Sequence, residues 1–345
     1  MPIYLKSLSY GEYVIHHEWA RALASMGGNY YPKFQVGVPF TPVTGPRFLV
    51  AEASRLDDLR RKLLQSALLV ARTADVSSLH CTFLEEAEWN AAGGLGFLKR
   101  TDTQFHWQNE DYSTFDEFLG SLSSRKRKNI RRERREAVQA GVSIERLRGG
   151  DLDQRHWDAL YSFYIDTGNR KWGIPYLSRE FFGLIAEWMA DEVLLVMCKR
   201  AGKYIAGAIH FIGAESLYGR YWGCIEHHPF LHFETCYYQA IEFAIEHGMR
   251  TVEAGAGGGH KLARGYVAKP TYSVHWLRNP ELRKAVSRFL GEERGWIQQD
   301  MELIESHSPY KRTRGAPPKG AHSDAAISNR TTMEAKTASE KHDDH

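Results

Sequence analysis

Several features that would assign a function directly are scarce or absent in this sequence of 345 residues. The four cysteines, Cys81, Cys198, Cys224 and Cys236, show no CxxC spacing, which predicts reduced thiols packed as small apolar side chains. No apolar run approaches the ~20 residues that a membrane-spanning helix needs. Neither sign of charge dominates, since 45 Lys and Arg accompany 42 Asp and Glu. We therefore expect a cytoplasmic protein in which any binding of polyanions depends on local clusters of charge.

Apolar and aromatic residues are abundant, at 43% and 12% of the chain, and predict a globular protein with room for two domains. Residues 56–71 place apolar side chains at helical spacing, whereas residues 79–84 and 193–199 read as strands. Such segments alternate along most of the chain. The pattern predicts an α/β (α+β) fold with mixed central sheets flanked by helices.

Composition and a short repeat suggest how the chain is divided. The motif YGxY occurs at residues 10–13 and again at 218–221, as expected if two similar units follow one another. We expect a partial first unit at residues 1–112, which lacks the beginning of the repeat, and a second unit at 113–305. From residue 306 to 345 large apolar residues nearly vanish, which predicts a disordered tail.

The most informative stretch is residues 232–266. It predicts a helix that Thr235 caps and Gly248 ends, and Glu234 would lie at the positive end of the helix dipole. A short strand follows and leads into a loop that contains four glycines. Bare backbone of this kind meets a need for positive φ or for close approach to a ligand. The loop is followed by His260, Lys261 and Arg264.

The spacing in this glycine loop excludes two standard phosphate sites. Gly259 is followed by His260 and Lys261 instead of the GK[ST] of a Walker A motif, and the spacing GxGxxG of a dinucleotide fold is also missing. No helix is expected directly after the loop. Two interpretations remain open, a flexible turn between strands and a binding loop that uses the three following donors.

A strongly basic helix is predicted at residues 125–135, where eight of eleven side chains are Lys or Arg and Glu133 is the one acid. Such a helix either is a solvated face that pairs with acids elsewhere or binds a polyanion. The polyanion would be an RNA, a nucleotide-bearing cofactor or an anionic surface.

The histidines show no confident metal pattern. The sequence HHxxxH at residues 227–232 is interrupted by Pro229, which favours a loop, so we expect no metal site. The loop at residues 167–173 is rich in residues that often line pockets, but it can equally be a surface connection. Four histidines are expected in strands, as core or pocket residues: His80, His106, His210 and His275.

The order of elements after residue 113, together with RKRKNIRRERREA, HFETCYYQAIEFAIEHG and GAGGGHKLARGY, resembles the FemAB-like branch of the GNAT acyltransferase superfamily. In particular it resembles bacterial FemAB-like proteins of peptidoglycan biosynthesis or recognition. The resemblance covers roughly residues 2–276 and implies tandem GNAT-like units, of which the first is short at its N-terminus here. The acetyl-CoA loop Q/R-x-x-G-x-G/A is absent, since PFLHFE (residues 229–234) stands in its place.

The resemblance implies an N-acyltransferase that joins an acyl or aminoacyl group to an amine. The co-substrate would be acyl-CoA or aminoacyl-tRNA, with no permanent cofactor, and the acceptor would be a small amine or a peptidoglycan precursor. The alternative is a non-catalytic protein that uses the basic helix to bind nucleic acid or an anionic surface.

This implied chemistry assigns roles to particular residues. The expected catalytic residues are Glu234, His260, Lys261 and Tyr238, with His232 and Glu253 as further bases and Tyr221 as an alternative acid. The expected donor-binding residues are Gly257, Gly258, Gly259, Arg264, His232, Arg125, Lys126, Arg127, Lys128, Arg131 and Arg132.

Overall fold

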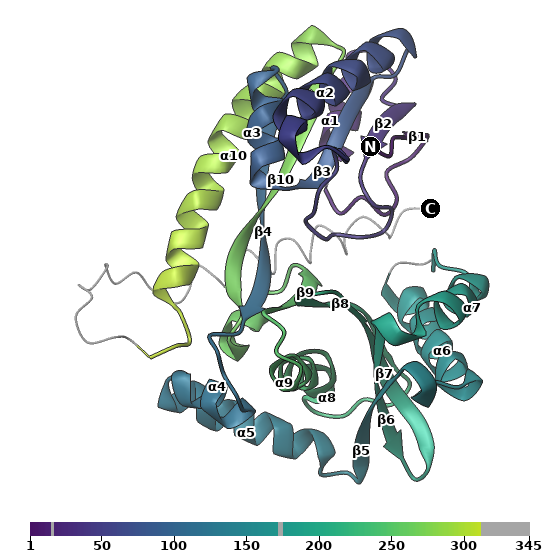
Figure 1. The fold of residues 1–345 in the computed structure, drawn as a ribbon, viewed down its shortest axis with the longest axis vertical. Coiled ribbons are helices and arrows are strands. Elements are labelled where there is room, and N and C mark those ends of the chain that lie inside the picture. The colour runs from purple at the N-terminus through teal and green to yellow at the C-terminus, as the bar shows by residue number, and fades with distance from the viewer. Residues whose placement is uncertain (15–16, 172–174, 312–345) are drawn as a thin grey trace. The chain divides into compact units, whose positions relative to one another are not determined.

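The computed structural model describes residues 1–14, 17–171 and 175–311 (Figure 1). The chain forms two compact units. Unit 1 comprises Met1–Gln104 and Ala268–Ile304, and unit 2 comprises Phe105–Val267 together with the residues from Glu305 onward. Strand β4 (Leu98–Gln108) leads from unit 1 into unit 2, and strand β10 (Val267–Leu277) leads back.

Unit 1 is a mixed sheet with helices on both faces. Strand β1 is antiparallel to β2, β2 is parallel to β3, and β3 is antiparallel to β10. Its remaining elements are β1 (Tyr4–Lys6), α1 (His17–Ser25), β2 (Lys33–Val36), a 3-10 turn (Ala53–Arg55), α2 (Leu56–Thr73), β3 (Ser78–Leu84), α3 (Glu86–Gly94) and α10 (Pro280–Ser306). The apolar stripe of α2 at Leu64, Ala67 and Ala71 packs against β3 residues Leu79 and Cys81.

The structure assigns the C-terminal strand and helix to unit 1 instead of the second unit, where the sequence placed residues 113–305. The reason is the apolar face of α10. Its buried residues Leu282, Val286 and Leu290 pack with Trp19 and Leu23 of α1. This corrects the expectation that the units follow one another along the chain.

The strands of unit 2 also pair in mixed directions. Strands β5 to β8 are antiparallel neighbours, and β9 is added in parallel to β8. Its strands are β5 (Val142–Arg148), β6 (Val193–Arg200), β7 (Lys203–Ile212), β8 (Ser216–Cys224) and β9 (Thr251–Ala256). Its helices are α4 (Phe115–Ser121), α5 (Ser124–Val138), α6 (Gln154–Lys171), α7 (Arg179–Trp188), α8 (Leu231–Phe233) and α9 (Gln239–Glu246), with shorter 3-10 turns at Gly149–Asp151 and Ala190–Glu192.

Helices α8 and α9 lie on the concave face of this sheet, and α6 and α7 lie on the opposite face (Figure 1). A π-helical turn, Glu234–Tyr238, joins α8 to α9. The predicted α/β class with mixed sheets and flanking helices is confirmed.

Two sequence expectations about this organisation are wrong. The two YGxY motifs lie in different kinds of structure. Residues 10–13 belong to a loop with a turn at residues 10–11 and positive φ at Gly11 and Tyr13, whereas residues 218–221 belong to β8. The tail does not begin at residue 306. Tyr310 is half-buried, and its hydroxyl donates to the carbonyl of Gly265 at 2.7 Å, which fixes this end of the described chain within unit 2. Residues 312–345 lie outside the described part of the chain.

Candidate active site

A cleft opens where two parallel strands stop pairing. Strands β8 and β9 pair from Ser216 with Thr251 to Tyr218 with Glu253, but both strands continue beyond that point. The cavity beside this opening measures about 110 Å³. Its lining residues come from β7, β8, β9 and the helices on the concave face: Ala208, Ile209, His210, Gly219, Arg220, Tyr221, Trp222, His232, Cys236, Tyr237 and Ala254.

The glycine loop continues directly from β9. Gly255, Gly257 and Gly258 have φ of 73°, 71° and 94°, so positive φ, one of the two needs that the sequence left open, is present here. A Cβ added at Gly258 would lie 2.8 Å from the His260 ring, whereas one added at Gly257 or Gly259 meets nothing within 4 Å. The loop is followed by a 3-10 helix, Gly259–Arg264, where the sequence predicted no helix.

The side chain of Lys261 binds the backbone at the C-terminal end of β9. Its Nζ donates to the carbonyl oxygens of Ala254 at 2.8 Å and Gly255 at 2.9 Å, and only 3% of the residue is exposed. Burial lowers the pKa of Lys261 to about 8, so the ammonium remains charged at neutral pH. An ammonium has three N–H donors, and these two bonds leave the third for another acceptor.

Arg264 is fixed by contacts on three sides. It donates from Nη1 to the carbonyl of His260 at 2.7 Å and from Nη2 to Glu133 of α5 at 3.0 Å, and its guanidinium carbon lies 3.4 Å from the Phe233 ring centroid. Glu133 also accepts a hydrogen bond from the Tyr238 hydroxyl. Both oxygens of the one acid in the basic segment are therefore engaged beneath the glycine loop.

Tyr238 points away from the cleft. It is fully buried, and burial raises the pKa of its hydroxyl. Its neighbour Tyr237 lines the cavity instead, and the Tyr237 hydroxyl lies 2.9 Å from His260 Nε2. The sequence offered no signal to choose between adjacent tyrosines, because successive residues on a helix face directions about 100° apart.

His260 is available as a neutral imidazole. Burial, followed by the nearby charges of Arg264 and Lys261, lowers its pKa to about 4. Tyr237 and His260 therefore form a neutral hydroxyl–imidazole pair at the edge of the cavity. Such a pair can accept a proton from a reacting group in the cleft.

Glu234 is committed to structural contacts, so the expectation of a general base at this position is not supported by the geometry. It is 3% exposed, accepts from Arg134 of α5 at 3.0 Å and accepts from Gln239 at 2.7 Å. The helix also begins earlier than expected, at Leu231. Thr235 consequently lies inside it and contacts the Cys198 sulfur at 3.2 Å instead of capping it.

Two further titratable residues lie near the opening. His210 is 1% exposed and lines the cavity, and within the described residues its Nδ1 has no hydrogen-bond partner. Burial lowers its pKa to about 4. Glu253 lies where the strand pairing stops, with Oε2 3.8 Å from His106 Nε2, and burial raises its pKa to about 7.

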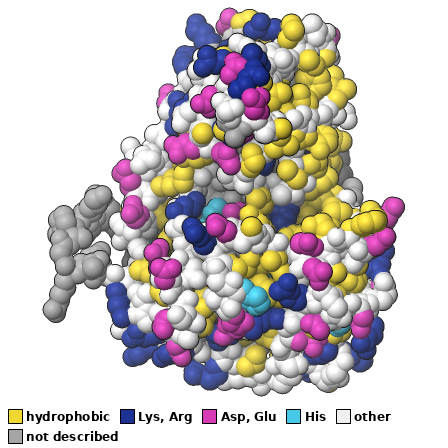
Figure 2. Space-filling view, viewed as in Figure 1, with side chains coloured by type: hydrophobic (Ala, Val, Ile, Leu, Met, Phe, Trp, Pro, Cys, Tyr) yellow, Lys and Arg dark blue, Asp and Glu magenta, His cyan; other side chains and the backbone are white. Residues whose placement is uncertain are grey.

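The basic segment forms helix α5 as predicted, and its two faces differ. Glu133 and Arg134 point inward to the 3-10 helix and the π-helical turn. The remaining cations lie on the outer face. Figure 2 shows Lys and Arg side chains gathered along the lower left edge, where Figure 1 places α5. The exposed members are Arg125, Lys128, Arg131, Arg132 and Arg135, while Lys126 and Arg127 are half-buried.

The other predicted positions fall as follows. His80, His106, His210 and His275 all lie in strands, as expected. Within residues 1–14, 17–171 and 175–311 no cluster of three or more His, Cys, Asp or Glu side chains is arranged to bind a metal ion. Residues 172–174 of the predicted pocket loop lie outside the described residues, and His227, His228 and His232 line a second cavity.

The fold and the cleft define a mixed α/β protein with an open cleft between parallel strands that leads into a glycine loop. The chain belongs to the FemAB-like family, described as peptidoglycan biosynthesis/recognition, whose family model matches residues 1–312. This match confirms the family that the sequence motifs indicated. No curated protein matches the chain.

Solved structures with a similar arrangement include FemX, with 15% identity, 73% of this chain and 85% of that chain covered, and a TM-score of 0.49. L-PGS from Bacillus licheniformis is 10% identical, with a TM-score of 0.49. The match covers 70% of this chain and 80% of L-PGS. A tandem GNAT protein from the clavulanic acid biosynthesis pathway is 12% identical, with a TM-score of 0.41. The match covers 73% of this chain and 77% of that protein. None of the helices described here has the length and apolar character to cross a membrane.

Proposed function

We propose that this protein is an N-acyltransferase that transfers an acyl or aminoacyl group to an amine and forms an amide. The observation that carries the proposal is the cleft between β8 and β9, where the neutral Tyr237–His260 pair lies beside the loop that holds Lys261. Amide formation needs a proton acceptor and a cation near the developing oxyanion. Membership of the FemAB-like family supports the same reaction class.

In the proposed reaction the amine nitrogen attacks the acyl carbonyl carbon, and charge develops on the carbonyl oxygen. The third N–H of the Lys261 ammonium and the backbone of Gly257–Gly259 stabilise that oxyanion. The amine proton passes to the Tyr237 hydroxyl, whose own proton moves to His260 Nε2. The C–N bond forms, the bond to the leaving group breaks, and the same pair returns the proton to the leaving group.

The exposed face of α5 is proposed to hold the phosphates of the donor, which would be an acyl-CoA or an aminoacyl-tRNA. Arg125 and Lys128 are exposed cations on the helix that contacts the glycine loop through Glu133 and Arg264. Phosphate groups bind best to such clusters of Lys and Arg. The acceptor is proposed to be an amine of a peptidoglycan precursor, as the family description suggests.

A direct test supplies the purified protein with acyl-CoA or aminoacyl-tRNA and with an amine-bearing precursor peptide, and measures amide product by mass spectrometry. Removing the proton acceptor in Tyr237→Phe or His260→Gln should lower the transfer rate by ~10²-fold or more. Tyr204→Phe is the control, since the Tyr204 hydroxyl binds Glu145 and Tyr204 does not line the cavity.

The alternative, a non-catalytic binding protein, is favoured only by the exposed basic face of α5. It predicts binding of RNA or anionic vesicles that weakens steeply with salt, and no amide product with any donor. If no donor gives amide product and the binding of RNA or vesicles depends steeply on salt, the alternative is correct.

A further inference from the structure

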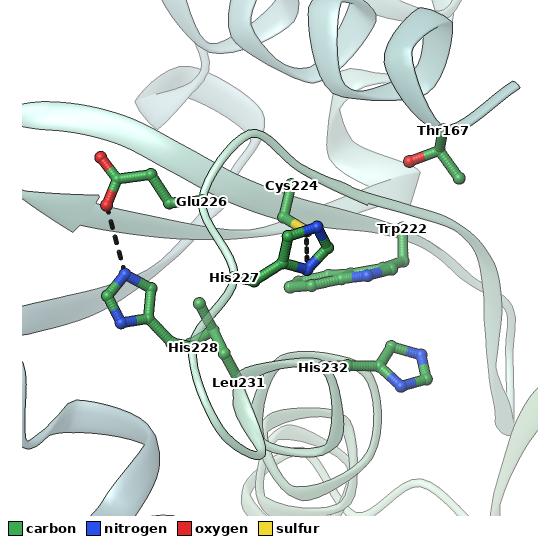
Figure 3. Close-up of a pocket in the computed structure, with 8 residues that line it drawn as sticks. All are labelled: Thr167, Trp222, Cys224, Glu226, His227, His228, Leu231 and His232. Carbon is green, nitrogen blue, oxygen red and sulfur yellow. Dashed lines mark hydrogen bonds and ion pairs between the residues drawn. The ribbon is translucent and has the colours of Figure 1, made fainter. Parts of the chain in front are cut away.

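A second cavity, of about 140 Å³, lies beside the cleft and shares two of its lining residues, Trp222 and His232. Figure 3 shows the Trp222 ring extending across the cavity with Thr167 on one side and the loop of residues 226–228 on the other. A water molecule needs only ~10–15 Å³ of such space. The cavity therefore admits a chemical group of several heavy atoms.

One polar atom in this cavity has no partner. Thr167 is 7% exposed, and its Oγ1 makes no hydrogen bond within the described residues. It comes from α6, on the opposite side of the cavity from the loop, and lines the cavity (Figure 3). Because buried hydroxyl groups are nearly always hydrogen-bonded, an unpaired one that faces a cavity points to a ligand that supplies the missing partner.

The charged groups around the cavity are already neutralised. Glu226 accepts from Arg200 at 2.7 Å and lies 3.2 Å from His228 Nε2. No Lys or Arg outside residues 170–174 lines the cavity within the described part of the chain. A hydroxyl donates and accepts without charge, so the lining suits an uncharged hydrogen-bonding group better than an ion.

A thiol lies within the same cavity. Cys224 Sγ is 3.8 Å from His227 Nδ1, and both residues line the space (Figure 3). An imidazole beside a thiol can accept the thiol proton when the sulfur attacks an electrophile. The alkylation rate of Cys224 therefore shows how readily a reagent enters the cavity.

We propose that this cavity is a binding pocket for a neutral amide or hydroxyl group on a short stem, in which the Thr167 hydroxyl binds the polar group and Trp222 covers the stem. Because Trp222 and His232 also line the cleft, a substrate in the cleft can extend into the pocket. That extension rests on the proposed transferase function, and it identifies the class of side group that the substrate carries. Binding in the pocket itself does not depend on transferase activity.

The experiment uses iodoacetamide, which is a neutral amide on a one-carbon stem, and compares it with iodoacetate, which carries a carboxylate on the same stem. Alkylation forms a bond from Cys224 sulfur to carbon, iodide leaves, and the thiol proton passes to His227. Peptide mass spectrometry measures the alkylation rate of Cys224, and Cys236 of the cleft is the internal reference.

We expect Thr167→Val to lower the rate of Cys224 alkylation by iodoacetamide about fivefold relative to Cys236, as the loss of one hydrogen bond predicts, and to leave alkylation by iodoacetate unchanged. Thr167→Ser keeps the hydroxyl and should retain the wild-type rate. Equal effects of Thr167→Val on both reagents, or none on either, would overturn the proposal.

The link to transfer has its own readout. Substrates with and without a neutral amide in the side group should differ in KM in the wild-type protein and become equal in Thr167→Val. A Thr167-dependent alkylation rate without any transfer would support the pocket and reject the proposed function. Transfer without a Thr167-dependent alkylation rate would support the proposed function and reject the pocket.

Discussion

Arg264 and Glu133 form a buried ion pair, 3.0 Å from Nη2 to Oε2, that joins the 3-10 helix after the glycine loop to the inner face of α5. The two residues are far apart in sequence, and their side chains are only 7% and 12% exposed. The pair explains why a single acid interrupts the basic segment. It also places the cationic outer face of α5 on the same helix that supports the proposed catalytic loop.

Removing Glu133 should destabilise the protein strongly. In Glu133→Ala the Arg264 guanidinium and the Tyr238 hydroxyl both lose a buried acceptor. Removing one partner of a buried ion pair lowers the free energy of unfolding by about 3–5 kcal/mol. Urea unfolding measures this loss. Glu136→Ala on the same helix is the control, since its ion pair with Arg132 is exposed and should be worth under ~1 kcal/mol. Equal losses in the two variants would contradict the role assigned to Glu133.

Lys261 should make stability rise with pH in the alkaline range. Burial lowers its pKa from 10.5 to about 8, so between these values the unfolded chain binds more protons than the folded protein. Stability attributable to this group therefore increases from about pH 8 to 10.5, by up to ~3 kcal/mol. Urea unfolding of wild type and Lys261→Met across this range measures the difference. Parallel stability curves for the two proteins would show that Lys261 does not titrate in this way.

His275 should make unit 1 sensitive to acid. Its Nδ1 lies 2.9 Å from His80 Nδ1 in a buried network, and burial, followed by Arg100 and Lys33, lowers the pKa of His275 well below its ordinary value, while Glu12 opposes this. As pH falls below about 6.5 the unfolded chain takes up a proton that the folded protein excludes. Stability should then fall by up to ~1.4 kcal/mol per pH unit.

The measurement for His275 is the melting temperature between pH 7 and 5. His275→Gln should show a shallower decrease than wild type. His17→Gln, at an exposed position on α1, should follow the wild-type curve. The same slope in all three proteins would rule out a contribution from His275.

The outer face of α5 should determine donor affinity and its dependence on salt. In the double variant Arg125→Gln, Lys128→Gln the protein loses two exposed cations but keeps the inner Glu133 and Arg134 contacts. Donor affinity should fall, and the slope of log affinity against log salt should decrease by about one for each donor phosphate that the variant no longer neutralises. Fluorescence titration of a labelled donor at several salt concentrations measures both quantities.

The matched control is Arg61→Gln, Lys62→Gln, two exposed cations of α2. It changes the net charge by the same amount. If this control alters the salt slope as much as the α5 variant does, the effect is a general charge effect and α5 is not the donor-binding surface.

The sequence by itself determined several of the elements and the family. Apolar spacing predicted α2, and the run of Lys and Arg predicted α5. The clustered glycines predicted either positive φ or close approach to a ligand, because both depend on the absence of a Cβ, and the structure shows positive φ. The combined motifs indicated the FemAB-like family, which the family match confirms.

Only the tertiary structure decided which side chains meet in the cleft. It turned Glu234 toward Arg134 and Tyr238 toward Glu133, and it brought Tyr237 to His260 instead. These choices depend on the rotation of a helix that begins at Leu231 and passes through a π-helical turn, and on contacts between residues about one hundred positions apart. Local patterns carry no information about either, since a one-residue change in where a helix starts moves every side chain to a different face.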